Sequence, residues 1–194
     1  DASSRSQWEI EGLTLTEEIA RVDKRHVRRK VLNRLRRRIE AADGIWLSIS
    51  PFPFPNRSAF NFRIDYDAHH PLDFRETLKA VSDHAHATSH FVNGATFEPH
   101  PESLELMRGL DVGSHGYWHH TYLTEEENLR NIRRGIDTLR SARIEPSGFA
   151  APMGRFNGQL LQALRKLGIG HSSEFALAYD ELPFFPSTGD LLQV

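Results

Sequence analysis

Segments typical of strands and segments typical of helices alternate along most of this chain. Short apolar runs are separated by stretches in which apolar residues recur every three or four positions. Because parallel strands need such crossovers, this alternation predicts a parallel sheet covered by helices, as a barrel or a doubly wound sheet. The predicted helices begin near residues 73, 101, 124 and 159, the first and third with a capping box. The predicted strands are residues 45–50, 59–67, 88–92, 110–114, 147–151, 169–173 and 191–194.

The first 44 residues differ from the rest in charge. They hold 11 Lys and Arg residues against 8 Asp and Glu, whereas residues 45–194 hold 13 against 18. We expect residues 1–12 to lack order and residues 16–42 to form one long amphipathic helix that ends near Gly44. Its apolar stripe should pack on the outside of the remaining chain. The stripe consists of Leu15, Ile19, Val22, Val31, Leu35 and Ile39.

Positive charge is concentrated in residues 21–38, where ten of 18 residues are Lys or Arg. Such a segment could contact an anionic lipid surface, a nucleic acid or an acidic polymer. A solvated helix face is the simpler interpretation, and nucleic acid is not the partner that we favour.

Composition excludes several kinds of site. The chain has no cysteine, which rules out disulfides, thiolate metal ligands and a cysteine nucleophile. No apolar run approaches the roughly 20 residues needed to cross a bilayer as a helix.

Two aspartates separated by one residue end the predicted strand 59–67. Because side chains alternate between the faces of a strand, Arg63, Asp65 and Asp67 share one face, and the apolar residues share the other. Two acids and an arginine on the inner face of a barrel strand would be costly unless they were paired or bound to a metal. The alternative is the polar face of a surface edge strand, since an Asp-x-Asp sequence alone is a weak signal.

Two histidines four residues apart follow the predicted strand 110–114. On a helical turn, His115 and His119 would point the same way and could present two imidazoles to one cation. Chance pairs are expected in a chain with 11 histidines. The position nevertheless favours function, because active sites of barrels lie just past the carboxyl ends of strands. His120 would point elsewhere on such a turn.

Four segments resemble motifs of the metal-dependent polysaccharide deacetylases. The first family motif has an Asp-x-Asp form in some branches, which corresponds to residues 63–67, RIDYD. The second motif, His-x-x-x-His after Gly-Ser, corresponds closely to residues 113–119, GSHGYWH. Between them, residues 87–94, ATSHFVNG, are similar to the family's Ala-Thr-Phe-Phe-Val-x-Gly. The third motif, Arg-x-Pro-Tyr-Gly, is partly kept in residues 150–154, AAPMG.

This resemblance implies a distorted (β/α) barrel that removes an acetyl group from an N-acetylated sugar or polysaccharide. Asp67, His115 and His119 would be the metal ligands, which leaves positions for water and the acetyl carbonyl. Asp65 would act as the general base, and the backbone N–H of Met153 would help to stabilise the oxyanion. One carboxylate and two imidazoles suit Zn²⁺ best, although Co²⁺, Ni²⁺ or Fe²⁺ would fit the same ligands.

Two departures from the family pattern bear on activity. The arginine that opens the third motif and orients the catalytic base is replaced by Ala150. Arg63 is our candidate replacement, because it shares a strand face with Asp65 within reach of its side chain. The family's late histidine, its general acid, has no counterpart before Val194, so we expect an incomplete barrel from a truncated chain. Glu174 lies near the place of an acidic family motif, but a solvent-exposed acid is an equally good interpretation.

The sequence thus predicts a basic helical extension over residues 1–44 and a deacetylase-like catalytic domain over residues 45–194. Two other functions stay open. One is an allantoinase-like hydrolase of a non-sugar amide, since loops select the substrate. The other is a carbohydrate-binding pseudoenzyme that keeps the ligands without the acid or the orienting arginine. The resemblance slightly favours the cell envelope or another extracytoplasmic place over the cytoplasm, and the oligomeric state is open.

Overall fold

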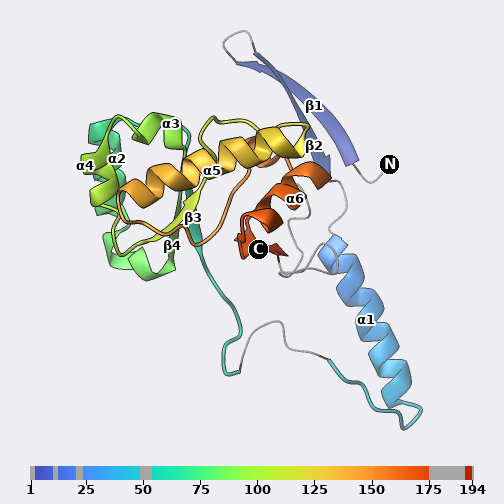
Figure 1. Cartoon of the computed structure of the whole chain (residues 1–194). Helices are drawn as coiled ribbons and strands as arrows, with labels where there is room; N and C mark the ends of the chain where they lie inside the picture. The colour runs from blue at the N-terminus through green and yellow to red at the C-terminus, as the bar shows by residue number, and fades with distance from the viewer. Residues whose placement is uncertain (1–2, 11–12, 21–23, 49–53, 175–190, 194) are drawn as a thin grey trace. The chain divides into compact units, whose positions relative to one another are not determined.

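The chain divides into two compact units, Asp1–Pro51 and Phe52–Val194. The computed structural model describes residues 3–10, 13–20, 24–48, 54–174 and 191–193 (Figure 1). Among these residues, no helix combines the length and the apolar character that crossing a membrane would require.

The described residues of the first unit form a β-hairpin and one helix. Strand β1 (Ser3–Ile10) pairs antiparallel with β2 (Leu13–Ala20), and helix α1 spans Lys24–Glu40. Leucine and threonine alternate at the start of β2, and this period of two suits a strand. The lack of order predicted for residues 1–12 is therefore wrong for β1, and the helix predicted over residues 16–42 begins only with α1.

The apolar stripe of α1 is exposed in the part of the chain that the structure describes. Val31, Leu35 and Ile39 expose 52%, 46% and 36% of their surfaces. The packing of this stripe on residues 45–194 stays a prediction. The strand predicted over residues 45–50 is also wrong where it can be compared. Residues 45–48 are irregular, and the last two positions lie outside the described residues.

The second unit is built on a parallel sheet. Strands β3 (Phe62–Tyr66), β4 (Thr88–Val92) and β5 (Asp111–Ser114) pair in that order. These strands agree with three of the predicted ones, although β3 begins later than expected. Their carboxyl ends all lie at one edge, because parallel strands run in the same direction.

Phe149 extends the parallel arrangement beyond β5. It forms single parallel bridges to Ser114 and to the second residue of β6 (His171–Ser172), which pairs with β7 (Leu192–Gln193). The strand predicted over residues 147–151 is thus reduced to one bridging residue among those described. A 3₁₀ turn at Pro152–Gly154 follows residue 151 directly and ends this extended segment.

Helices connect the strands, as predicted. Thr124 caps α5 as expected: its Oγ1 accepts the N–H of Glu127 at 3.3 Å, and it donates to the carboxylate of Glu127 at 2.5 Å instead of leaving that carboxylate to the Thr124 N–H. The capping box predicted at Asp73 is wrong, because Pro71 begins α2 and keeps His70 extended. The helices and 3₁₀ turns are α2 (Pro71–Ala80), η1 (Ser82–Ala87), α3 (Gly94–Phe97), α4 (Pro101–Glu105), α5 (Glu125–Ser141), η2 (Pro152–Gly154) and α6 (Gly158–Lys166).

The two faces of the central strands meet different surroundings. Tyr66 and Val92 join the apolar core that also contains residues of the flanking helices. On the opposite face, the guanidinium of Arg63 lies over the ring of Phe91, 5.4 Å from its centroid. That ring fills the space that a side chain at Gly113 would need. The alternation of β3 therefore places its polar side chains on the face opposite the apolar core.

Candidate metal centre

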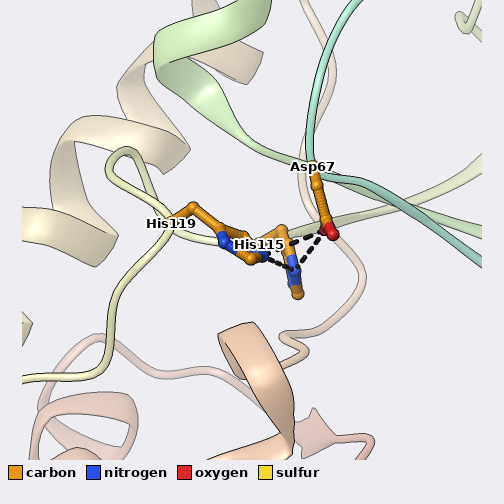
Figure 2. A group of neighbouring side chains, drawn as sticks. All are labelled: Asp67, His115 and His119. Carbon is orange, nitrogen blue, oxygen red and sulfur yellow. Dashed lines mark hydrogen bonds and ion pairs between the residues drawn. The ribbon is translucent and has the colours of Figure 1, made fainter. Parts of the chain in front are cut away.

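Three side chains meet at the carboxyl end of the parallel sheet (Figure 2). Asp67 follows β3 directly, His115 follows β5 directly, and His119 lies four residues further along the same loop. Asp67 Oδ1 lies 3.2 Å from His115 Nε2 and 3.0 Å from His119 Nε2. The two imidazole nitrogens are 3.2 Å apart. The structure thus brings together the three residues that the sequence singled out as ligands.

His119 reaches this site from a loop. The helical turn that we expected between the two histidines is wrong, because the chain there is irregular and Gly116 has φ 77°. The side chain of Asn131, in α5, accepts the N–H of Tyr117 at 3.0 Å and of Trp118 at 2.7 Å. Asn131 is 1% exposed and shapes the loop. Sequence analysis missed it, since a polar residue on an apolar helix face does not indicate its partner.

A hydrogen bond at Nδ1 sets the tautomer of His115. This nitrogen lies 2.8 Å from the backbone carbonyl oxygen of Ala150, so it donates, and the lone pair of Nε2 faces Asp67. Burial lowers the pKa of His115 below its ordinary value and outweighs the opposing effect of Asp65. The ring is therefore in the neutral form that a metal ligand requires.

The donor atoms fit a divalent cation. Ligand bonds of about 2.0–2.2 Å in a tetrahedral arrangement place donor atoms about 3.3–3.5 Å apart. The separations of 3.0–3.2 Å seen here are close to that value. Three electron-rich atoms this close repel one another unless a cation or protons lie between them. The set of one carboxylate oxygen and two imidazole nitrogens could therefore hold a metal ion.

Arg63 and Asp65 form an ion pair beside this group. Arg63 Nε donates to Asp65 Oδ1 at 2.7 Å, and Nη2 makes a second, shorter contact with Oδ2. The contact predicted between these two side chains is confirmed. Arg63 Nη1 donates to the backbone oxygen of Ser173 at 2.6 Å, which holds the guanidinium from its other side. Such a bidentate, part-buried pair fixes the orientation of a carboxylate better than a single contact does.

Glu174 is a buried acid, and the suggestion that it could equally be a solvent-exposed acid is wrong. It exposes 7% of its surface. Its carboxylate accepts the N–H of Ala151 at 3.0 Å and the hydroxyl of Ser172 at 2.5 Å. Burial raises the pKa of Glu174 to about 7. Its position just after a predicted strand was the signal available in the sequence.

The stability of the metal-free chain should depend on pH through Glu174. The folded state raises the pKa of this carboxyl from 4.5 to about 7. The stability that the protonated carboxyl contributes is therefore fully present below pH 4.5 and is lost as the pH rises through about 7. As the pH rises from about 4.5 to about 8, the wild type should lose stability that Glu174→Gln keeps. The difference in free energy of unfolding between the two proteins should therefore shift by roughly 3 kcal/mol in favour of the variant. Urea unfolding of both proteins measures this difference.

The comparison between the two proteins isolates Glu174. Burial lowers the pKa of His90 and His115, and these groups oppose the trend because their stabilising effect is lost as the pH falls. Both histidines are present in both proteins, so the effect of His90 cancels in the difference, and His115 contributes only as far as the substitution changes its pKa. A difference in stability that stays constant over this pH range would contradict the account of Glu174.

Comparison with known proteins assigns the chain to a family. The sequence profile of polysaccharide deacetylases matches residues 63–171, more than half of the chain. The chain belongs to the polysaccharide deacetylase family. The family contains deacetylases, which are hydrolases and generally depend on a metal. A comparison with curated proteins found no significant match.

Solved structures related to polysaccharide deacetylases share the fold. A protein from Mycobacterium smegmatis described as a polysaccharide deacetylase aligns with a TM-score of 0.60 and 22% identity, over 77% of this chain and 63% of its own. A family 4 carbohydrate esterase pseudoenzyme from Bacillus anthracis aligns with a TM-score of 0.55 and 19% identity, over 64% and 47%. A family 4 carbohydrate esterase from Streptomyces lividans, in complex with acetate, aligns with a TM-score of 0.52 and 20% identity, over 59% and 61%.

The chain spans about half to three fifths of the length of these structures. Its parallel sheet with connecting helices is part of the distorted β/α barrel of the polysaccharide deacetylases, which confirms the predicted fold class.

The third segment of similarity to the polysaccharide deacetylases forms a tight turn. Met153, within η2, has φ 58° and exposes 75% of its surface, whereas Ala151 before the turn is fully buried. Ala150 contributes its carbonyl oxygen to His115 and has no side chain that could reach Asp65. In this member of the family, Asp65 has its cationic partner, Arg63, in the first segment of similarity, residues 63–67.

Proposed function

We propose that this chain is a metal-dependent hydrolase that removes an acetyl group from an N-acetylated sugar or polysaccharide. One observation supports the proposal: the donor atoms of Asp67, His115 and His119 converge beside the Arg63–Asp65 ion pair. Two imidazoles, a carboxylate ligand and a separate oriented carboxylate are the parts that metal-assisted hydrolysis uses. Membership of the polysaccharide deacetylase family supports an acetyl group as the target.

Asp67, His115 and His119 would hold the cation through one oxygen and two nitrogens. A bound divalent cation supplies Lewis-acid chemistry for the acetyl carbonyl and for the attacking water. Zn²⁺ is our candidate, and Co²⁺, Ni²⁺ and Fe²⁺ suit the same donors.

Asp65 would accept the proton of the attacking water. Its two oxygens are held by Arg63, which leaves the carboxylate with one orientation relative to the site. In this way Arg63 would compensate for the arginine that is replaced by Ala150. The backbone N–H of Met153 would donate to the oxyanion that develops on the carbonyl oxygen. That role needs only a backbone donor, so the identity of the side chain is immaterial.

A pseudoenzyme is the competing function that a specific observation favours, because Ala150 stands where the family has its orienting arginine. The ion pair between Arg63 and Asp65 counts against it, since the base keeps a fixed cationic partner. An allantoinase-like hydrolase uses the same kind of site, and only the substrate separates it from a deacetylase.

Release of acetate from N-acetylglucosamine oligomers tests the proposal. The full chain is stripped of metal with a chelator and reloaded with Zn²⁺, and acetate is measured at each stage. We expect acetate only after reloading. Hydrolysis of allantoin without acetate release would favour the allantoinase-like function. Zinc binding without turnover of either substrate would favour the pseudoenzyme.

Replacing Arg63 with methionine should lower the turnover number by about 100-fold, the order expected when a reacting group is misplaced by a small distance. The metal content should stay unchanged, since Arg63 contacts Asp65 and not the three ligands. Arg63→Lys, which keeps the charge but not the bidentate geometry, should recover part of the activity. Arg75→Met, at an exposed position of α2, is the matched control. Full activity in Arg63→Met would contradict the compensating role.

A further inference from the structure

One peptide group connects Glu174 to His115. The carbonyl oxygen of Ala150 accepts the Nδ1–H of His115 at 2.8 Å. The N–H of Ala151, which belongs to the same peptide bond, donates to Glu174 Oε1 at 3.0 Å and lies 3.2 Å from Oε2. A carboxylate, a peptide group and an imidazole therefore form one continuous line of hydrogen bonds that ends at the candidate metal centre.

Every member of this line is buried. Water therefore competes little for these hydrogen bonds, and bonds in series polarise one another in such surroundings. The hydroxyl of Ser172 donates to the same carboxylate at 2.5 Å and fixes it from another side. Burial raises the pKa of Glu174 to about 7 although the two donors and the positive charge of Arg63 oppose this effect, so the side chain is mainly a carboxylate above that pH. The exposed fractions are 1% for His115, 0% for Ala150, 0% for Ala151, 0% for Ser172 and 7% for Glu174.

We propose that Glu174 is a positioning residue that acts on His115 through the Ala150–Ala151 peptide group, an inference that rests on the proposed metal centre. A carboxylate that accepts the peptide N–H draws electron density toward the carbonyl oxygen and makes it a stronger acceptor for Nδ1–H. The stronger bond holds His115 in the tautomer that offers Nε2 and increases its basicity as a ligand. Carboxylates bonded directly to ligand histidines have this effect in metal sites. Here the effect passes through one peptide group.

The tautomer of His115 in the metal-free chain provides the first test. Glu174→Gln keeps the shape of the side chain and an acceptor for the Ala151 N–H, but it removes the charge. Nitrogen NMR of the labelled imidazole should show mainly the Nδ1–H tautomer in the wild type and a larger share of the Nε2–H tautomer in the variant. This readout needs neither metal nor turnover.

The affinity for Zn²⁺ provides the second test. Glu174→Gln should bind Zn²⁺ about 10-fold more weakly, at the lower end of the range for residues behind a metal ligand. Thr124→Ala removes the cap of α5, which lowers stability without touching the line of hydrogen bonds, and should bind Zn²⁺ as the wild type does. This control separates an effect on His115 from a general loss of stability.

The outcomes separate this inference from the proposed function. Unchanged tautomer and unchanged affinity in Glu174→Gln would overturn the inference, as would an equal loss of affinity in Thr124→Ala. A wild-type chain that binds no Zn²⁺ would overturn the proposed function, and the tautomer measurement would still decide the role of Glu174. If the glutamine variant does not fold, Glu174→Asp serves as the alternative. It keeps the charge, but its shorter side chain moves the carboxylate away from the N–H of Ala151. A wild-type tautomer in that variant would overturn the inference.

Discussion

Replacing Asp65 with asparagine should lower the turnover number for acetate release by about 10²- to 10⁴-fold, the contribution of a general base. The asparagine keeps the shape of the side chain and an oxygen for Arg63, but it cannot take a proton from water. The zinc content should stay at the wild-type value, because Asp65 is not among the three converging donors. Acetate release and zinc content, measured on the same preparation, check both parts of this result.

Asp83→Asn is the matched control for this variant. Asp83 is exposed in η1, which precedes β4 and therefore lies toward the amino end of that strand, away from the site. It should keep full activity and full zinc content. Loss of zinc from Asp65→Asn would make Asp65 a ligand, and wild-type turnover would remove it from the reaction.

Replacing His115 with glutamine should weaken zinc binding by more than about 100-fold, beyond the range for residues that act behind a ligand. Nε2 of His115 is one of three donor atoms, and an amide group is a much weaker ligand for zinc than an imidazole. Turnover should fall together with the metal content. Equilibrium dialysis against Zn²⁺, followed by the acetate assay, measures both quantities.

His120→Gln is the control in the same loop. His120 is exposed, and its ring lies edge-on to the ring of Tyr122 with centroids 4.7 Å apart. It is not part of the converging group and should keep the wild-type zinc affinity. An equal loss of zinc in His120→Gln and His115→Gln would mean that the loop, rather than the imidazole of His115, determines binding.

The sequence predicts the second unit better than the first for a physical reason. Strand β4 has the predicted bounds, because Asn93 and a glycine follow its last residue and stop it clearly. All five residues of β4 are buried, which is typical of a strand inside a parallel sheet. In the first unit, the stripe that begins at Leu15 fits a helical period, yet residues 13–16 also alternate with a period of two. Pairing with a neighbouring strand decides between the two periods, and one segment read alone does not contain that information.

The candidate site shows the same division. Asp67 and His115 could be predicted because each directly follows a strand, and parallel strands bring such positions together. The loop that returns His119 depends on Asn131 in a later helix, so the spacing of the two histidines suggested the wrong local structure. Glu174 likewise acquires its role only from contacts with segments distant in sequence. Sequence reasoning finds donors at strand ends, whereas the residues that orient them appear only in the folded chain.

The most direct test of the central claim is a crystal structure of the chain with Zn²⁺, with diffraction recorded at the zinc absorption edge. We predict one anomalous peak about 2.0–2.2 Å from Asp67 Oδ1, His115 Nε2 and His119 Nε2. The carboxylate of Asp65 should lie outside that bonding distance and remain paired with Arg63. A zinc ion bound elsewhere, or no ion at these three residues at saturating Zn²⁺, would contradict the account.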